Sequence, residues 1–172
     1  DVQKLTDGRI VHKVRAGEGA AIAEGEAVTA MVDESLRLAT ARNHTATHLL
    51  QRALKEILGP GVNQAGSQVT PERLRFDFTY PEAMTGEELT KVEYLVNDAI
   101  LRNLPVAWCE MPMAEARAAG AVALFGEKYG EIVRTIAIGG KQPFSYELCG
   151  GTHVEETGDI GLFLITFEGS AA

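Results

Sequence analysis

The sequence is short of the residues that mark several large classes of protein. Its 172 residues include two cysteines and four histidines, and no run approaches the roughly 18 uncharged apolar residues of a membrane helix. Two cysteines cannot form the disulfide framework of a small secreted domain, so a reducing compartment is favoured. The chain opens on Asp1-Val-Gln-Lys4, without an apolar signal segment. We therefore expect a cytoplasmic protein with no membrane partner.

Positive charge is also scarce. The chain carries 24 acidic and 16 basic residues, for a net charge of −8. This balance argues against a protein that holds nucleic acid by bulk electrostatics. It does not exclude an enzyme that touches only the end of an RNA, since such an enzyme needs just a local basic rim. A hydrophobic content of 45% is ordinary for a globular protein and is enough to bury a core without disulfides.

Most of the few histidines are gathered into two short pairs. His44 and His48 are spaced i, i+4, and so are Cys149 and His153. Three imidazoles and one thiolate are a full ligand set for a tetrahedral Zn²⁺. Residues i and i+4 share one face of a helix, so the first pair could bind one ion without strain. The alternative is that each of the four is an ordinary core or surface residue. The presence of both pairs in one chain makes this alternative less favoured.

The residues around the pairs narrow the chemistry. A zinc peptidase of the HExxH type has a Glu after the first His, and here that position is Thr45. Four protein ligands usually mean a structural zinc, whereas a catalytic zinc keeps an open position, so the ligands alone do not decide. The two glycines between Cys149 and His153 and the small hydroxylated Thr47 beside a ligand favour catalysis.

The pattern of the whole chain predicts an α+β fold with helices against a largely antiparallel sheet. Helices are expected over 35–58, from a Thr85-Gly-Glu-Glu88 capping box to about 102, and over 113–119 with Pro112 at the first helical position. Strands are expected within 9–14 and 27–32, and then over 62–69, 74–78, 106–110, 132–138, 144–148 and 161–167.

Other polar residues are weaker candidates. The run Asn63-Gln-Ala-Gly-Ser67 could belong to a site or to a solvated edge strand. Lys128 lies between two glycines, where a phosphate contact and a solvated turn are about equally favoured. Single arginines are more often solvated, and the candidates are Arg42, Arg73, Arg75 and Arg134. His12 is predicted at the surface, and Cys109 as a small buried side chain.

Five segments, in order along the chain, resemble the editing domain of alanyl-tRNA synthetases. They are Arg42-Asn-His-Thr-Ala-Thr-His-Leu-Leu50, Gln64-Ala-Gly-Ser-Gln-Val69, Arg73-Leu-Arg-Phe-Asp-Phe78, Ala123-Leu-Phe-Gly-Glu-Lys-Tyr-Gly130 and Glu147-Leu-Cys-Gly-Gly-Thr-His-Val154. Five motifs in the right order are a highly specific signal. The segment 157–167 fits too, and the first 35 residues are similar to the end of the small β-barrel that precedes this domain.

The resemblance implies a fold and a set of site residues. The fold would be a two-layer sandwich of helices on a largely antiparallel sheet over 35–172, preceded by the truncated end of a β-barrel over 1–34. Gln64 falls at a position associated with editing activity, and Thr47 at one expected to sense the serine hydroxyl. One Zn²⁺ per chain would be bound by His44, His48, Cys149 and His153. Candidate substrate-binding residues are Thr47, Gln64, Arg42, Arg73 and Lys128.

The implied activity is hydrolysis of the ester of tRNA(Ala) wrongly charged with serine or glycine. The partners would be the acceptor end of tRNA(Ala) and the rest of the synthetase polypeptide. This activity is chemically reasonable, because serine and glycine each differ from alanine by one small group. A single binding step distinguishes amino acids that differ by such a group by only about 10–200-fold. A second site that hydrogen-bonds the serine hydroxyl is therefore needed, and Thr47 and Gln64 carry groups of the right kind.

Several alternatives stay open. The parts that flank this segment in whole synthetases are not in the sequence, so an excised piece is expected, and a free-standing editing protein or a threonyl-type editing domain is the runner-up. A zinc-stabilised RNA-binding module without catalysis is a different class of function. A zinc hydrolase of small esters, active without tRNA, is a third.

Overall fold

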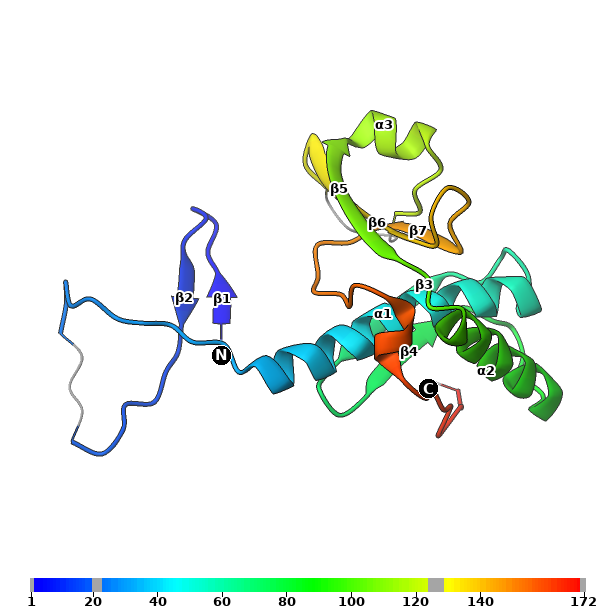
Figure 1. Ribbon diagram of the computed structural model, residues 1–172, viewed down its shortest axis with the longest axis horizontal. Coiled ribbons are helices and arrows are strands. Elements are labelled where there is room, and N and C mark those ends of the chain that lie inside the picture. The colour runs from blue at the N-terminus through cyan, green and yellow to red at the C-terminus, as the bar shows by residue number, and fades with distance from the viewer. Residues whose placement is uncertain (1, 20–22, 124–128, 171–172) are drawn as a thin grey trace. The chain divides into compact units, whose positions relative to one another are not determined.

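The computed structural model describes residues 2–19, 23–123 and 129–170, and these form two compact units, Asp1–Val32 and Asp33–Ala172 (Figure 1). Lys128 therefore lies outside the described residues. In the first unit, β1 (Val2–Lys4) pairs antiparallel with β2 (Ile10–His12), and His12 is exposed as predicted. The predicted strand over 27–32 is wrong. These residues pair with no neighbouring strand in the described chain, and Met31 is 89% exposed.

Two long helices organise the second unit, and local sequence signals set their ends. Helix α1 (Glu34–Leu58) begins where the Asp33 side chain accepts from the Leu36 amide, and it ends at Gly59, whose φ of 104° suits glycine. Helix α2 (Gly86–Leu101) begins at the predicted capping box of Thr85 and Glu88. Shorter helices are α3 (Met113–Ala118) and the 3-10 turn η1 (Thr157–Ile160). No helix in the described part of the chain is long and apolar enough to cross a membrane.

The strands of this unit pair antiparallel in two separate sheets. One holds β3 (Gln64–Val69) and β4 (Leu74–Phe78), with a bulge between Gln64 and Gly66. The other holds β5 (Val106–Pro112), β6 (Ile132–Ile138) and β7 (Ser145–Leu148) in that order. The expectation of an α+β fold is confirmed.

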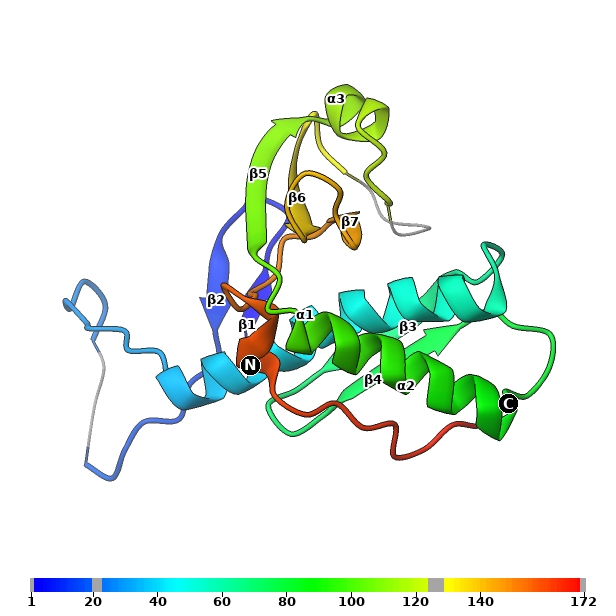
Figure 2. The same cartoon turned by 45° about the vertical axis from the view of Figure 1, so that its right-hand side comes forward.

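One main core joins the helices to both sheets. Helices α1 and α2 pack side by side next to β3 and β4 (Figure 2). Their facing residues are inaccessible to solvent, and Ile136 and Ile138 of β6 complete the same cluster. The fully buried apolar residues of the helices are Leu49, Ala53, Val92, Val96 and Ala99. Burial of one such Leu or Val is worth roughly 1.5–3 kcal/mol. This packing holds the middle of α1 rigidly, which matters because His44 and His48 lie there.

Three local predictions in the second unit are also wrong. The segment 161–167 is not a strand, because side chains of α2 form hydrogen bonds with its backbone. The Asn97 side chain accepts from the Phe163 amide and donates to the Phe163 carbonyl oxygen. Pro112 ends β5 and is the N-cap of α3, one position before the predicted one. Cys109 is exposed rather than buried, because it lies on β5, which is an edge strand of its sheet.

Candidate metal centre

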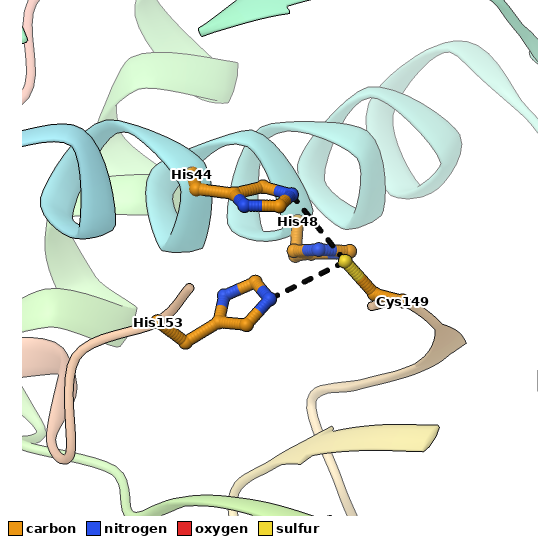
Figure 3. Close-up of side chains that lie close together, drawn as sticks. All are labelled: His44, His48, Cys149 and His153. Carbon is orange, nitrogen blue, oxygen red and sulfur yellow. Dashed lines mark hydrogen bonds between the residues drawn. The ribbon is translucent and has the colours of Figure 1, made fainter. Parts of the chain in front are cut away.

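The structure brings together the four residues of the two sequence pairs. His44 and His48 lie one turn apart on α1, and Cys149 directly follows β7 in a loop that carries His153 back over the helix (Figure 3). The Cys149 Sγ atom is 3.3 Å from His44 Nε2 and 3.3 Å from His153 Nε2. One donor atom from each of the four residues lies within 4.8 Å of all the others. The cluster is therefore compact enough to surround a single ion.

The donor atoms fit a tetrahedral metal ion. Ligand atoms about 2.0–2.3 Å from a zinc ion lie about 3.3–3.8 Å from one another, close to the distances from Sγ. His48 Nε2 is buried and is the one buried side-chain nitrogen or oxygen in the described residues without a hydrogen-bond partner. A buried polar atom without a partner is costly, and a metal ion at the centre of the cluster would satisfy it. One thiolate and three imidazoles favour a borderline-soft ion such as Zn²⁺.

A second layer of polar groups orients two of the imidazoles. Glu147 Oε2 lies 2.9 Å from His48 Nδ1, and Ser145 Oγ donates to the other carboxylate oxygen over 2.7 Å. Thr45 Oγ1 lies 3.1 Å from His153 Nδ1 and accepts from the Val154 amide. In both rings the hydrogen bond occupies Nδ1 and leaves Nε2 for the centre of the cluster. This is the arrangement that carboxylates and hydroxyls give to metal-binding histidines.

Glu147→Ala is expected to lower the affinity for Zn²⁺ by about 10–100-fold, the usual cost of removing such an orienting partner. Glu147→Gln should lose less, because an amide oxygen can still accept from His48 Nδ1. Competition with a chromophoric chelator measures both, and Glu131→Ala, an exposed glutamate just before β6, is the control. Equal affinity in Glu147→Ala and in the unchanged protein would show that the carboxylate does not orient the ligand.

Close packing fixes the loop between Cys149 and His153. A Cβ atom on Gly151 would lie 1.9 Å from His44 Cε1, so only glycine allows the ring to lie against the backbone there. Arg134 on β6 donates to the Gly151 carbonyl oxygen over 2.5 Å, and its guanidinium lies 5.1 Å from the centre of the Trp108 ring. The loop is therefore held from the helix side and from the sheet side.

Burial and charge shift the pKa values inside the cluster. Burial alone would raise the pKa of the Cys149 thiol, but hydrogen bonds from His153 and His44 outweigh it and lower this pKa to about 3. Burial would likewise lower the pKa of His48, but the Cys149 thiolate and the Glu147 carboxylate raise it to about 10. Burial lowers the pKa of His153. Cys149 is thus a thiolate at neutral pH, which is the form that binds a metal ion.

A cavity of about 740 Å³ opens beside this centre. His153 belongs both to the cluster and to the cavity wall, and the loop residues Gly150, Gly151 and Thr152 line it as well. Residues of β5, β6 and the start of α1 also line the cavity: Trp108, Arg134, Ile136 and Arg37. A molecule in the cavity would therefore lie next to His153 of the four-residue cluster.

Of the other predicted site residues that the structure describes, Arg134 lines the cavity, whereas Thr47, Gln64, Arg42 and Arg73 lie outside both the cluster and the cavity wall. Thr47 is buried on α1, and its hydroxyl donates to the Asn43 carbonyl oxygen over 2.9 Å, which leaves its lone pairs free to accept. Gln64 begins β3, where its amide donates to Ser67 Oγ. Arg42 is exposed on α1, and Arg73 is exposed in the turn between β3 and β4. The roles proposed for these four residues remain predictions.

Comparisons with known proteins identify the family. Residues 133–172 match the family described as the threonyl and alanyl tRNA synthetase second additional domain. The chain is 57% identical to the alanine–tRNA ligase of Carboxydothermus hydrogenoformans over 99% of its length, and 54% identical to that of Desulfitobacterium hafniense over 98%. The alanine–tRNA ligase of Thermus thermophilus is 55% identical over 96% of the chain. The chain belongs to the alanyl-tRNA synthetase family. It spans about 19% of the length of these relatives.

This membership confirms the resemblance carried by the five motifs and assigns the chain to the editing-domain part of such a synthetase. Reasoning from the sequence missed two contacts at the site, that of Glu147 with His48 and that of Trp108 with Arg134. Glu147 stands within the last motif, two residues before Cys149, but its contact with His48 depends on the alternation of β7. Trp108 and Arg134 meet only because β5 and β6 pair, and spacing along the chain gives no signal of that contact.

Proposed function

We propose that this chain hydrolyses the aminoacyl ester of tRNA(Ala) wrongly charged with serine or glycine. The single observation that carries the proposal is the four-residue cluster, with the unpartnered Nε2 atom of His48 inside it, at the edge of a cavity. Support comes from relatives named alanine–tRNA ligases that are similar over nearly the whole chain. Because the chain corresponds to about a fifth of each relative, a role in aminoacylation by the whole polypeptide is a further proposal and not a property of this segment.

The cofactor of the proposed reaction is one Zn²⁺ held by His44, His48, Cys149 and His153. When bound, such an ion supplies Lewis-acid polarisation of an ester carbonyl or activation of a water. The chain's own residues do the rest. Glu147 and Thr45 keep the ring nitrogens of His48 and His153 directed at the centre, and Arg134 holds the loop in place. Ester cleavage needs less help than amide cleavage, so a separate protein base is not required.

Selection against alanine would rest on a hydrogen bond that alanine cannot make. The Thr47 hydroxyl already donates within α1, so it would accept from the serine hydroxyl. Gln64 would supply an amide on the neighbouring strand β3. A site built to hydrogen-bond a substrate hydroxyl rejects an analogue that lacks it, because its buried polar groups are then left unpaired. The editing fold implied by the family, a two-layer sandwich preceded by part of a β-barrel, is proposed on the same ground.

Deacylation of three charged tRNAs tests the function. Ser-tRNA(Ala) and Gly-tRNA(Ala) should be hydrolysed and Ala-tRNA(Ala) spared, and a chelator should slow the reaction by about 100-fold, since the metal is expected to supply several kcal/mol. Restored activity on adding back Zn²⁺ is the control for damage by the chelator. Cleavage of Ala-tRNA(Ala) at the same rate as Ser-tRNA(Ala) would contradict a proofreading role.

A purely structural metal is the competing function, and the closed set of four protein ligands favours it. In that case the ion ties α1 to the loop after β7, and the chain binds RNA without hydrolysis. The same experiment separates the two functions when thermal unfolding is measured alongside. Loss of the fold on chelation, with no deacylation under any condition, would support the structural role. Loss of hydrolysis with the fold retained would support catalysis.

A further inference from the structure

One polar side chain on the ligand-bearing helix is buried without a hydrogen-bond partner. Gln51 on α1 is 4% exposed, and its amide makes no hydrogen bond to another described residue. Both amide atoms still touch solvent, because His48 Nε2 is the one fully enclosed nitrogen or oxygen of the described side chains that lacks a partner. A buried amide without a partner is costly, and native structures keep few of them. Gln51 therefore carries polar groups that the fold itself does not use, at a point that solvent reaches.

Helix geometry places Gln51 on the face of α1 that also carries the two histidines and Thr47. It follows His48 by three residues, Thr47 by four and His44 by seven, so it lies within about 60° of each around the helix axis. Figure 3 shows both histidines turned towards Cys149 from this side of the helix. Side chains on a helix tilt towards its N-terminus, so a long residue covers the turn before its own Cα atom. The Gln51 amide is therefore directed over the turn that carries Thr47 and His48.

Thr47 and Gln51 together offer one acceptor and one donor to a small ligand. The Thr47 hydroxyl hydrogen is given to the Asn43 carbonyl oxygen, so Thr47 can only accept a further hydrogen bond. The Gln51 amide nitrogen supplies N–H groups that have no partner in the fold. Gln64 differs, because its amide already donates to Ser67 Oγ over 3.1 Å. A hydroxyl group, which both donates and accepts, matches the Thr47 and Gln51 pair, whereas a methyl group satisfies neither residue.

We propose that Gln51 is a specificity-determining residue, whose amide N–H donates to the hydroxyl oxygen of a seryl group while Thr47 accepts from the same hydroxyl. The inference rests on the proposed function, since it names a residue that recognises one of the two substrates. A glycyl group has no hydroxyl, so its hydrolysis does not depend on this hydrogen bond. The seryl and glycyl substrates should therefore respond differently to the loss of the amide.

Gln51→Met nearly keeps the length of the side chain and removes its amide. The ratio of kcat/KM for Ser-tRNA(Ala) to kcat/KM for Gly-tRNA(Ala) should fall by about 5–150-fold, the usual effect of leaving one buried hydrogen-bonding group unpaired. Zinc content should be unchanged, and the Tm should hold or rise, because a buried polar group without a partner is removed. A glutamine that only stabilised the fold would instead lower the Tm and slow both reactions alike. Gln68→Met, which changes an exposed glutamine on β3, is the matched control.

Binding gives a second measurement that needs no catalysis. The probes are labelled RNA hairpins with the acceptor stem of tRNA(Ala), whose 3′ ends carry serine or alanine through an amide that is not hydrolysed. The unchanged chain should bind the seryl hairpin more tightly than the alanyl hairpin, since alanine leaves both Thr47 and Gln51 unpaired. Gln51→Met should lose most of this preference, and Gln68→Met should keep it. An equal preference for the seryl hairpin in Gln51→Met and in the unchanged chain would overturn the proposal.

The outcomes separate this inference from the function on which it rests. Deacylation of Ser-tRNA(Ala) and Gly-tRNA(Ala) that is unaffected by Gln51→Met, or slowed equally for both, would refute the hydroxyl contact and leave the hydrolase intact. A preference for the seryl hairpin that depends on Gln51, without any deacylation, would support the contact and refute the hydrolase. Neither preference nor deacylation in the unchanged chain would refute both.

Discussion

Cys149→Ala is expected to lose its bound zinc and all measurable deacylation of Ser-tRNA(Ala). The Cys149 Sγ atom is the contact shared by His44 and His153, at 3.3 Å from each Nε2 atom. Its removal takes away the only thiolate of the cluster and the contact that each of these two Nε2 atoms makes with sulfur. The loss of zinc affinity should exceed the about 10–100-fold that an orienting residue outside the ligand set is worth. Elemental analysis and a deacylation assay on the same preparation measure the two effects.

The second cysteine provides a matched control. Cys109 is exposed on β5 and lies outside both the cluster and the cavity wall. Cys109→Ala should therefore keep full zinc content and full hydrolysis, with the same loss of one thiol. If Cys149→Ala loses its zinc but hydrolyses Ser-tRNA(Ala) at the unchanged rate, the metal is structural and the reaction belongs to other residues. If it keeps its zinc, the ligand assignment itself is wrong.

The helices could be predicted because their signals are local. The Asp33 cap, the capping box at Thr85 and the stop at Gly59 each depend on residues within one turn. The segment 161–167 could not be predicted in the same way. Its run of apolar residues resembles a strand, but side chains of Asn97 and Glu93 on α2, rather than a neighbouring strand, bond its backbone. Such a partner lies far away in the sequence, and no periodicity reveals it.

The same distinction holds at the site. The ligands could be proposed because His44 and His48 are one helical turn apart and only a few other histidines exist. The roles of Ser145 and Glu147 require knowing that β7 turns these side chains inward, with both residues 5–6% exposed. The cavity requires the pairing of β5 with β6, which a single sequence does not specify. Spacing therefore predicted the four residues of the cluster, and tertiary structure was needed for the residues that surround them.

Gly151→Ala should disrupt the metal centre nearly as severely as loss of a ligand, although glycine itself binds nothing there. The added Cβ atom would lie 1.9 Å from His44 Cε1 and 2.3 Å from His44 Nδ1, distances that real contacts do not reach. The ring is mounted on a packed helix, and Arg134 holds the loop from the other side. Either the ring turns away or the loop lifts, and both separate donor atoms that must stay within about 0.2 Å of their ideal distances.

Zinc affinity is expected to fall by at least about 100-fold, which is more than the loss of an orienting residue outside the ligand set would cause. Overpacking should also cost about 1–3 kcal/mol of stability and lower the Tm. Chelator competition and thermal unfolding measure these effects. Gly150→Ala is a control one residue away, since its Cβ would meet nothing within 4 Å and its φ is not positive. It should bind zinc as tightly as the unchanged chain, within the about 0.5 kcal/mol typical of surface changes. Equal loss in both variants would mean that loop flexibility, rather than the contact between Gly151 and His44, controls the centre.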